Sequence, residues 1–185
     1  HIAYYNSAEE SKQQLKLTAE RIGLKNGFIV GQRNSMPDIL DDCNKLQEKY
    51  PNKKLILFVD SLQAISDGRF STGRITSRTA EENIDQLISF CKDEAKIKSG
   101  KAMTAIAIGQ TTKEGKMAGA NALRHKVDTF AEMSILEKTK DPDLDAFVGC
   151  RIIEVGKNRF GGAGRQAFLK MEPSGLELVA QGSMI

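Results

Sequence analysis

The chain has 185 residues, of which 40% are hydrophobic and 28% are charged, and its net charge is +3. These values are typical of one ordinary globular domain, and they exclude a disordered or fibrous protein. No run approaches the ~18 apolar residues of a membrane span and no signal-peptide pattern opens the chain, so we predict a cytoplasmic protein without a membrane partner.

The first two thirds of the sequence alternate between strand-like and helix-like patterns. Short apolar runs predict strands at residues 2–6, 28–30, 55–59 and 103–108. Apolar residues at steps of three and four predict helices around residues 15–22, 39–46 and 84–95. This alternation predicts an α/β fold with a mainly parallel central sheet that is flanked by helices.

The last third of the sequence has a different pattern. From Thr129 onward, strand-like runs are joined by turn residues, at residues 130–136, 148–155, 166–171 and 176–180. They predict a C-terminal antiparallel extension of the sheet. The length favours one core, so residues 1–185 are interpreted as a single domain.

The cysteines and histidines do not form a metal-binding pattern. Cys43, Cys91 and Cys150 are far apart in the sequence, and His1 and His125 are the two histidines. This spacing fits reduced thiols and no zinc site in this segment.

Three polar residues follow directly after predicted strands: Glu9, Asp60 and Gln110. Ligands of open α/β sheets bind beyond the carboxyl ends of the strands, so these residues are candidates for a site. Each also has a simpler interpretation: Glu9 could complement the start of a helix, Asp60 could cap a turn, and Gln110 could be a loop amide.

The functional interpretation of these residues is phosphoryl chemistry. "LILFVDS" is shaped like a Walker B strand, whose Asp60 would hold Mg²⁺ through water. Glu9 could orient the water that attacks a γ-phosphate, and Gln110 could sense that phosphate and signal to the loop that follows.

Basic charge gathers in stretches 66–78, 111–126 and 157–170, while the rest of the chain is net acidic. Glycine-bearing basic stretches of this kind suggest a surface that faces an anion. In "KNRFGGAG", Lys157 and Arg159 are two positions apart and would project from one face of a strand. They are either surface charges or cations that neutralise a transferring phosphoryl group of a neighbouring subunit.

These motifs resemble the bacterial RadA (Sms) DNA-repair ATPases of the RecA superfamily nearly end to end. "YNSAEES" is similar to that family's strand with a catalytic glutamate, "FVDSLQAI" to its Walker B strand, and "GQTTKEGKMAGANALRHKVDT" to the segment after it. "KNRFG" matches the family's signature pentapeptide and is the most specific motif in the chain.

The resemblance implies a RecA-like P-loop NTPase core that works with ATP and Mg²⁺ and assembles into a ring or filament. ATP would lie between subunits, with Lys157 and Arg159 reaching the γ-phosphate of the next subunit. It also implies that two loops face single-stranded DNA, with these basic residues as contacts: Arg69, Arg74, Arg78, Lys113 and Lys116.

The sequence departs from the family at several positions. Ala120 replaces a proline, Arg124 replaces a glutamate and Gln110 replaces a histidine. No G-x-x-x-x-G-K-[ST] phosphate loop occurs in the sequence, so we expect an N-terminally incomplete ATPase core that binds ATP poorly alone. Two alternatives are open: a replicative-type hexameric DNA helicase with the same fold, and a non-hydrolysing regulatory paralogue.

Overall fold

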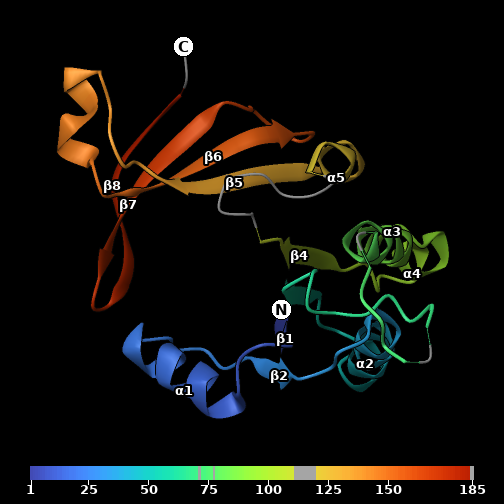
Figure 1. Ribbon diagram of the computed structural model, residues 1–185. Coiled ribbons are helices and arrows are strands. Elements are labelled where there is room, and N and C mark those ends of the chain that lie inside the picture. The colour runs from blue at the N-terminus through green and yellow to red at the C-terminus, as the bar shows by residue number, and fades with distance from the viewer. Residues whose placement is uncertain (71, 77, 111–119, 184–185) are drawn as a thin grey trace. The chain divides into compact units, whose positions relative to one another are not determined.

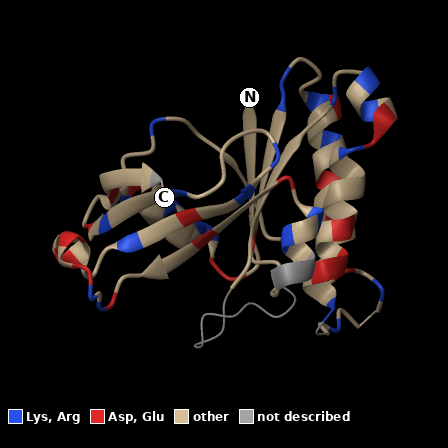
Figure 2. Cartoon of the chain, turned by 90° about the horizontal axis from the view of Figure 1, so that it is seen from above, with Lys and Arg blue, Asp and Glu red and all other residues tan. Residues whose placement is uncertain are grey.

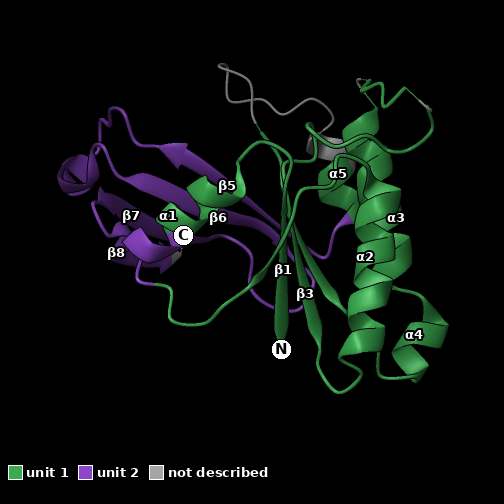
Figure 3. Cartoon of the chain, turned by 90° about the horizontal axis from the view of Figure 1, so that it is seen from below, with its two compact units in different colours: residues 1–18, 24–126 green, residues 19–23, 127–185 purple. Residues whose placement is uncertain are grey.

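The computed structural model describes residues 1–70, 72–76, 78–110 and 120–183, without the side chains of 120–122 and 183. The chain divides into two units (Figure 3). Unit 1 comprises residues 1–18 and 24–126, and unit 2 comprises residues 19–23 and 127–185. The single-domain interpretation of residues 1–185 stays a prediction.

Unit 1 is built on a parallel sheet of four strands in the order β2-β1-β3-β4 (Figure 1). The strands are β1 (Ile2–Ser7), β2 (Ile29–Gly31), β3 (Leu55–Asp60) and β4 (Thr104–Ile108). All four correspond to predicted strands. The crossover connections of a parallel sheet require helices, which explains the alternating pattern of the sequence.

One face of this sheet is buried beneath two helices, α2 (Met36–Lys49) and α3 (Thr79–Cys91), which lie on the same side of it (Figure 3). Leu55, Leu57 and Val59 alternate along β3 and are 2% exposed or less, because successive side chains of a strand point to opposite faces. Met36 and Ile39 of α2 are fully buried on the facing side. The parallel α/β fold that the sequence predicts is therefore confirmed.

Helix boundaries follow local signals. Ser35 caps α2 by accepting a hydrogen bond from the Asp38 N–H, and the helix stops at Lys49, two positions before Pro51. Helix α1 (Lys12–Arg21) starts with a capping box: Ser11 Oγ accepts from the Gln14 N–H, and Gln14 Oε1 accepts from the Ser11 N–H.

Two helical regions differ from the sequence prediction. The helix predicted around 84–95 ends at Cys91, and a short helix α4 (Glu94–Lys98) begins again after Asp93. The Asp93 carboxylate accepts hydrogen bonds from the Ala95 and Lys96 N–H groups, so this residue starts a new helix and does not continue the old one. Helix α5 (Ala120–Lys126) was not predicted.

Unit 2 contains an antiparallel sheet of four strands in sequence order, as the turn-rich last third of the sequence predicts. The strands are β5 (Thr129–Ile135), β6 (Arg151–Asn158), β7 (Arg165–Glu172) and β8 (Gly175–Ser183), with a 3₁₀ helix η1 (Pro142–Phe147) between β5 and β6. Pro173 and Ser174 form the tight turn between β7 and β8, where Gly175 has φ +122°.

Charges of both signs lie along the helices, with Lys and Arg next to Asp and Glu (Figure 2). No helix of the described residues is long and apolar enough to cross a membrane. Within the same residues, no group of three or more His, Cys, Asp or Glu side chains is arranged to hold a metal ion.

Truncation of the β3 core should destabilise the fold. Leu57→Ala removes a fully buried side chain from the middle of the central strand. It should lower the free energy of unfolding by about 2–5 kcal/mol, because the lost apolar contacts leave a cavity. Urea denaturation followed by circular dichroism measures this change.

Leu17→Ala is the matched control, because Leu17 is 65% exposed on α1. We expect it to change the free energy of unfolding by less than about 0.5 kcal/mol. Equal losses for the two variants would contradict the assignment of the core.

Candidate active site at the carboxyl edge of the unit 1 sheet

The register of the parallel strands brings three chain segments to one level. Ser7 of β1 pairs with Asp60 of β3, and Asp60 pairs with Ile108 of β4. Since parallel strands all end at the same edge, the residues that follow these three positions meet there. Glu9 and Gln110 each come two positions after their strand, so the three predicted residues share the carboxyl edge of the sheet.

A serine turn places Glu9. Ser7 is almost fully buried, and its Oγ accepts hydrogen bonds from the backbone N–H groups of Glu9 and Glu10, at 3.4 and 3.0 Å. This side-chain turn bends the chain directly after β1. The Ala8 N–H also donates to the Asp60 carbonyl at 3.0 Å, which ties the turn to β3.

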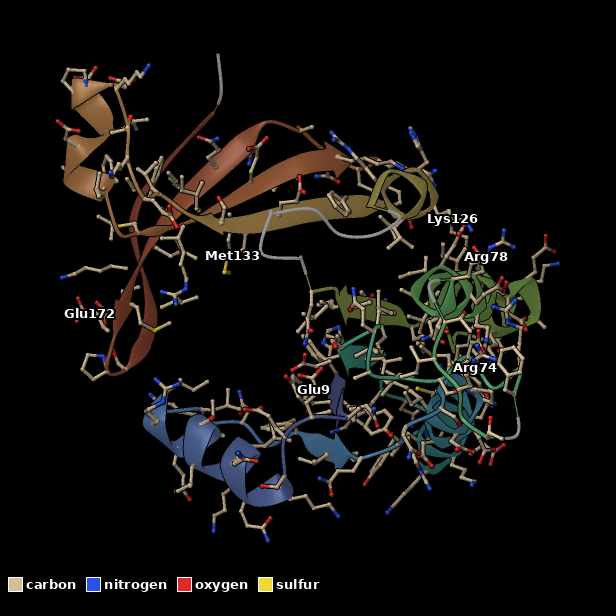
Figure 4. All side chains as sticks on the ribbon, in the orientation of Figure 1. Glu9, Arg74, Arg78, Lys126, Met133 and Glu172 are labelled. Atoms are coloured by element: carbon tan, nitrogen blue, oxygen red, sulfur yellow. The ribbon has the colours of Figure 1, made fainter. Side chains whose placement is uncertain are left out.

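The Glu9 carboxylate is the centre of the hydrogen-bonded cluster. Gln110 Nε2 donates to both of its oxygens, at 2.9 Å to Oε1 and 3.1 Å to Oε2. The buried Ser61 hydroxyl donates to Oε1 at 2.9 Å. Thus groups from positions 9, 61 and 110 are in direct contact, and Figure 4 shows Glu9 among the polar atoms at the end of the sheet.

Asp60 is held by an aromatic neighbour on β1. The Tyr5 hydroxyl donates to Asp60 Oδ2 at 2.6 Å, and the Tyr5 ring stacks on Phe58 with 6.1 Å between centroids. Burial of the phenol, followed by its hydrogen bond to Asp60, raises the pKa of Tyr5. The phenol therefore stays a neutral donor at physiological pH, and it fixes the direction of the Asp60 carboxylate.

Gln63 links the segment after β3 to the segment after β4. Its Oε1 accepts from the Gln110 backbone N–H at 3.1 Å, and its Nε2 donates to the Gln110 carbonyl at 3.2 Å. Just before it, the Leu62 N–H donates to the Ile108 carbonyl at 2.9 Å. The β3 and β4 segments thus stay joined beyond the last paired residues of the two strands.

The predicted DNA-contacting arginines have different surroundings. Arg69 forms ion pairs with Asp67 at 2.9 Å and Glu82 at 3.0 Å, so its guanidinium is engaged within unit 1. Arg74 and Arg78 are exposed, and Arg78 directly precedes α3 (Figure 4). Lys113 and Lys116 lie outside the described residues.

The KNRFG segment closes β6 of unit 2. Lys157 is the last residue but one of β6 and is half-buried, while Arg159 lies just beyond the strand and is exposed. The expectation that both project from one strand face stays a prediction, because β6 ends at Asn158 and Arg159 lies in the turn that follows it.

Arg159 is held in place by Asp128. Arg159 Nη1 donates to Asp128 Oδ1 at 2.9 Å, and the Arg159 backbone N–H donates to the Asp128 carbonyl at 2.9 Å. Further along the turn, Gly164 has φ +77°, a conformation that favours glycine, and its N–H donates to the Val155 carbonyl. The glycines thus allow the chain to return as β7.

Four residues of the site were not found by sequence reasoning: Tyr5, Ser7, Ser61 and Gln63. Ser61 and Gln63 have a local signal, since they follow a strand that ends in Asp60 within "DSLQ". Tyr5 and Ser7 have no such signal, because a tyrosine in a strand and a serine at a strand end are also common in sheets that carry no functional site.

Known proteins resemble this chain in sequence. No protein-family model matches the chain. The DNA repair protein RadA of Aquifex aeolicus is 33% identical over 180 residues, which cover 97% of this chain and 36% of the relative. The DNA repair protein RadA of Bacillus subtilis is 30% identical over 182 residues, which cover 98% of this chain and 35% of that relative.

Solved structures share the fold at low sequence identity. The RadB recombinase has a TM-score of 0.54 and 18% identity, over 97% of this chain and 79% of that chain. A KaiC-like protein from Pyrococcus horikoshii has a TM-score of 0.60 and 12% identity, over 97% of this chain and 77% of that chain.

The chain is a homologue of the RadA proteins over nearly its whole length. Its fold is RecA-like, as the resemblance of the KNRFG and Walker B motifs implies. The chain spans about a third of the length of the RadA relatives that it matches.

The RadA relationship implies nucleotide and Mg²⁺, and the residues of this chain fit part of such a site. Asp60 supplies a carboxylate, the ligand type that Mg²⁺ prefers, at the end of a buried strand. Glu9 and Gln110 supply a proton acceptor and an amide beside it. The sequence contains no G-x-x-x-x-G-K-[ST] loop, so the backbone cradle for the phosphates is not among these 185 residues.

The Tyr5–Asp60 hydrogen bond should give a pH-dependent contribution to stability. Since folding raises the pKa of Tyr5, the bond stabilises the native state fully below the ordinary tyrosine value near 10 and loses this effect as the pH rises further. We expect Tyr5→Phe to lower the free energy of unfolding by about 1–2 kcal/mol between pH 6 and 9.

The difference between wild type and Tyr5→Phe should shrink above about pH 10, as measured by urea denaturation at several pH values. Tyr50→Phe is the control, because Tyr50 follows the carboxyl end of α2, away from Asp60. A Tyr5→Phe difference that grows with rising pH would show that the phenol does not act as the donor to Asp60.

Proposed function

We propose that this chain is the core of a RadA-type DNA-dependent ATPase that acts in homologous recombination and DNA repair. The observation that carries the proposal is the contact of Glu9 with Ser61 and Gln110 beside Asp60, at the carboxyl edge of a RecA-like sheet. The RadA relatives are named as DNA repair proteins, which supports the same role. Its place of action is the cytoplasm.

Glu9 is the proposed general base. It accepts a proton from a water molecule whose oxygen bonds to the γ-phosphorus of ATP, while the bond from that phosphorus to the bridging oxygen breaks and its electron pair leaves with ADP. Gln110 donates to Glu9 in this structure, and the same amide can donate to a phosphate oxygen. Gln110 therefore acts as the proposed phosphate sensor.

Asp60 is the proposed Mg²⁺ residue. Its carboxylate would hold the ion through water, and Mg²⁺ would neutralise charge on the β- and γ-phosphates. Tyr5 engages Asp60 Oδ2 and so presents the carboxylate in one direction. The phosphate cradle must come from residues outside this sequence, so the 185-residue chain alone is expected to bind ATP poorly.

Lys157 and Arg159 are proposed to act on ATP held by a neighbouring subunit of a ring or filament. Arg159 is 45% exposed even though it pairs with Asp128, so its guanidinium is presented on the surface of unit 2. A guanidinium supplied across a subunit interface neutralises the charge that develops in phosphoryl transfer.

Single-stranded DNA is the proposed partner of the basic stretches. Arg74 and Arg78 support this role best because they are exposed. Arg69 has its charge matched by Asp67 and Glu82, and its contribution to DNA binding should be smaller. Lys113 and Lys116 remain proposed contacts on the strength of the resemblance.

A replicative-type hexameric helicase is the second candidate. A DnaB-like replicative helicase shares the fold with a TM-score of 0.55 and 12% identity, over 95% of this chain and 50% of that chain. Strand unwinding from a free end without recombination partners would favour the helicase. The gene sequence distinguishes a non-hydrolysing regulatory paralogue from the enzyme. A phosphate-loop motif encoded upstream of His1 would support the enzyme.

Mixing two inactive variants of the full-length protein tests action across the interface. Glu9→Gln should lower the ATPase rate by about 10²–10⁴-fold, and Arg159→Ala by about 10³-fold. An equal mixture should recover up to about a quarter of the wild-type rate, because one interface in four then combines an intact Glu9 with an intact Arg159.

The recovery is measured with a phosphate-release assay after subunit exchange. A mixture of Glu9→Gln with a Glu9→Gln/Arg159→Ala double variant is the control and should stay inactive. If the first mixture also stays inactive although subunits exchange, Arg159 acts within its own subunit. A wild-type protein without ATPase activity would remove the proposed function altogether.

Salt-dependent DNA binding tests the basic surface. Replacing both Arg74 and Arg78 with Ala should weaken binding to a single-stranded oligonucleotide and lower the slope of log K against log salt by about 1.4, since each contact releases about 0.7 counterions. Fluorescence anisotropy at several salt concentrations measures this slope.

The double variant Lys53→Ala/Lys54→Ala is the charge-matched control. These exposed lysines precede β3, at the opposite edge of the sheet from Glu9. Their removal should leave the slope unchanged. Identical slopes for the two double variants would contradict a DNA surface at Arg74 and Arg78.

A further inference from the structure

The strand pairing of unit 1 continues past the ends of β3 and β4 through a side chain. The last paired residues are Asp60 and Ile108, and the Leu62 N–H still donates to the Ile108 carbonyl. Two residues further along β4's chain segment, the side-chain amide of Gln63 makes the hydrogen bonds that a neighbouring strand would make. It bonds both the backbone N–H and the backbone C=O of Gln110. A side-chain amide can do this because it carries both a donor and an acceptor.

Asn6 makes the same pair of amide-to-backbone hydrogen bonds at this edge of the sheet. Asn6 is fully buried, its Oδ1 accepts from the Arg33 N–H, and its Nδ2 donates to the Arg33 carbonyl, both at 2.9 Å. The Asn6 amide joins β1 to the segment that follows β2. In the same way, the Gln63 amide joins the segment that follows β3 to the segment that follows β4. Two side-chain amides therefore hold two segments that leave the carboxyl edge.

The Gln63 amide acts on the residue that contacts Glu9. The Gln110 main chain is bonded by Gln63, and the Gln110 side chain bonds both oxygens of Glu9. Gln110 is exposed, and the Gln63 amide fixes its main chain at both the N–H and the C=O. A small displacement of the main chain would move the amide out of hydrogen-bond reach of Glu9, because hydrogen bonds weaken steeply beyond their normal distance.

We propose that Gln63 is a positioning residue that holds the main chain of Gln110 so that its amide stays aligned with Glu9. Gln63 itself does not contact the reacting atoms. The proposal rests on the ATPase role assigned above to Glu9 and Gln110. It adds that the "DSLQ" segment delivers both the proposed Mg²⁺ residue, Asp60, and the residue that orients the proposed phosphate sensor.

The kinetic test uses Gln63→Met in the full-length protein, because methionine keeps the length of the side chain and removes both hydrogen bonds. We expect kcat for ATP hydrolysis to fall roughly 10–100-fold, since misplacement of a catalytic group by about 1 Å has effects of this order. KM for ATP should change by less than about twofold, because Gln63 is not proposed to bind ATP.

Gln47→Met is the matched control. Gln47 is 5% exposed, and its Nε2 donates to the carbonyl of Lys101, which precedes β4 at the amino edge of the sheet. It makes the same kind of amide-to-backbone bond away from the site. The Gln47 variant should lose stability and keep the wild-type kcat, which separates positioning from a purely structural effect.

A double-mutant cycle with Gln110→Ala identifies the route of the effect. If Gln63 acts through the Gln110 side chain, Gln63→Met should change kcat by less than about twofold once that side chain is absent. An equal fall of kcat in both backgrounds, or an unchanged kcat in the single variant, would overturn the proposal.

Hydrogen exchange of the Gln110 backbone N–H tests the positioning independently of ATP hydrolysis. Gln63→Met should speed exchange of the Gln110 N–H because its acceptor is lost, whereas Gln47→Met should not. Unchanged exchange overturns the proposal. If exchange responds to Gln63→Met while the wild type and Glu9→Gln both lack ATPase activity, the positioning stands and the proposed function fails.

Discussion

The candidate site depends on one constraint, the parallel register that sets Ser7, Asp60 and Ile108 side by side. Because of this register, the segments that follow β1, β3 and β4 leave the sheet at the same edge. Glu9 therefore contacts Gln110, which lies 101 positions away in the sequence. The register in turn depends on burial: Leu55, Leu57 and Val59 must face α2 and α3, and a shift of one residue would turn them to the opposite face.

Polar side chains convert this coarse alignment into a defined geometry. Ser7 shapes the turn before Glu9, Tyr5 directs Asp60, and Gln63 holds Gln110. Each supporting group bonds to a backbone atom or to a carboxylate, so the groups proposed for chemistry do not have to supply their own orientation. This division between supporting and reacting groups is expected for sites built on the ends of rigid strands.

Unit 2 presents its proposed functional residues by other means. β6 ends at Asn158, and Arg159 lies in the turn that follows, where Asp128 holds both its side chain and its backbone. An arginine paired in this way is ordered before any contact with another subunit, which lowers the conformational entropy that such a contact would cost. Gly164, with φ +77°, then allows the chain to turn back into β7 after these cations.

The sequence by itself determined the α/β class, the strands of both sheets and the positions of Glu9, Asp60 and Gln110 after them, because apolar periodicity and strand ends are local properties of the chain. Only the tertiary structure decided which side chains touch. The bonds from Gln110 to Glu9 and from Tyr5 to Asp60 span 101 and 55 positions, and no local pattern encodes such distant partners. The break between α3 and α4 and the end of β6 at Asn158 were likewise set by competing hydrogen bonds and by strand register, which periodicity does not report.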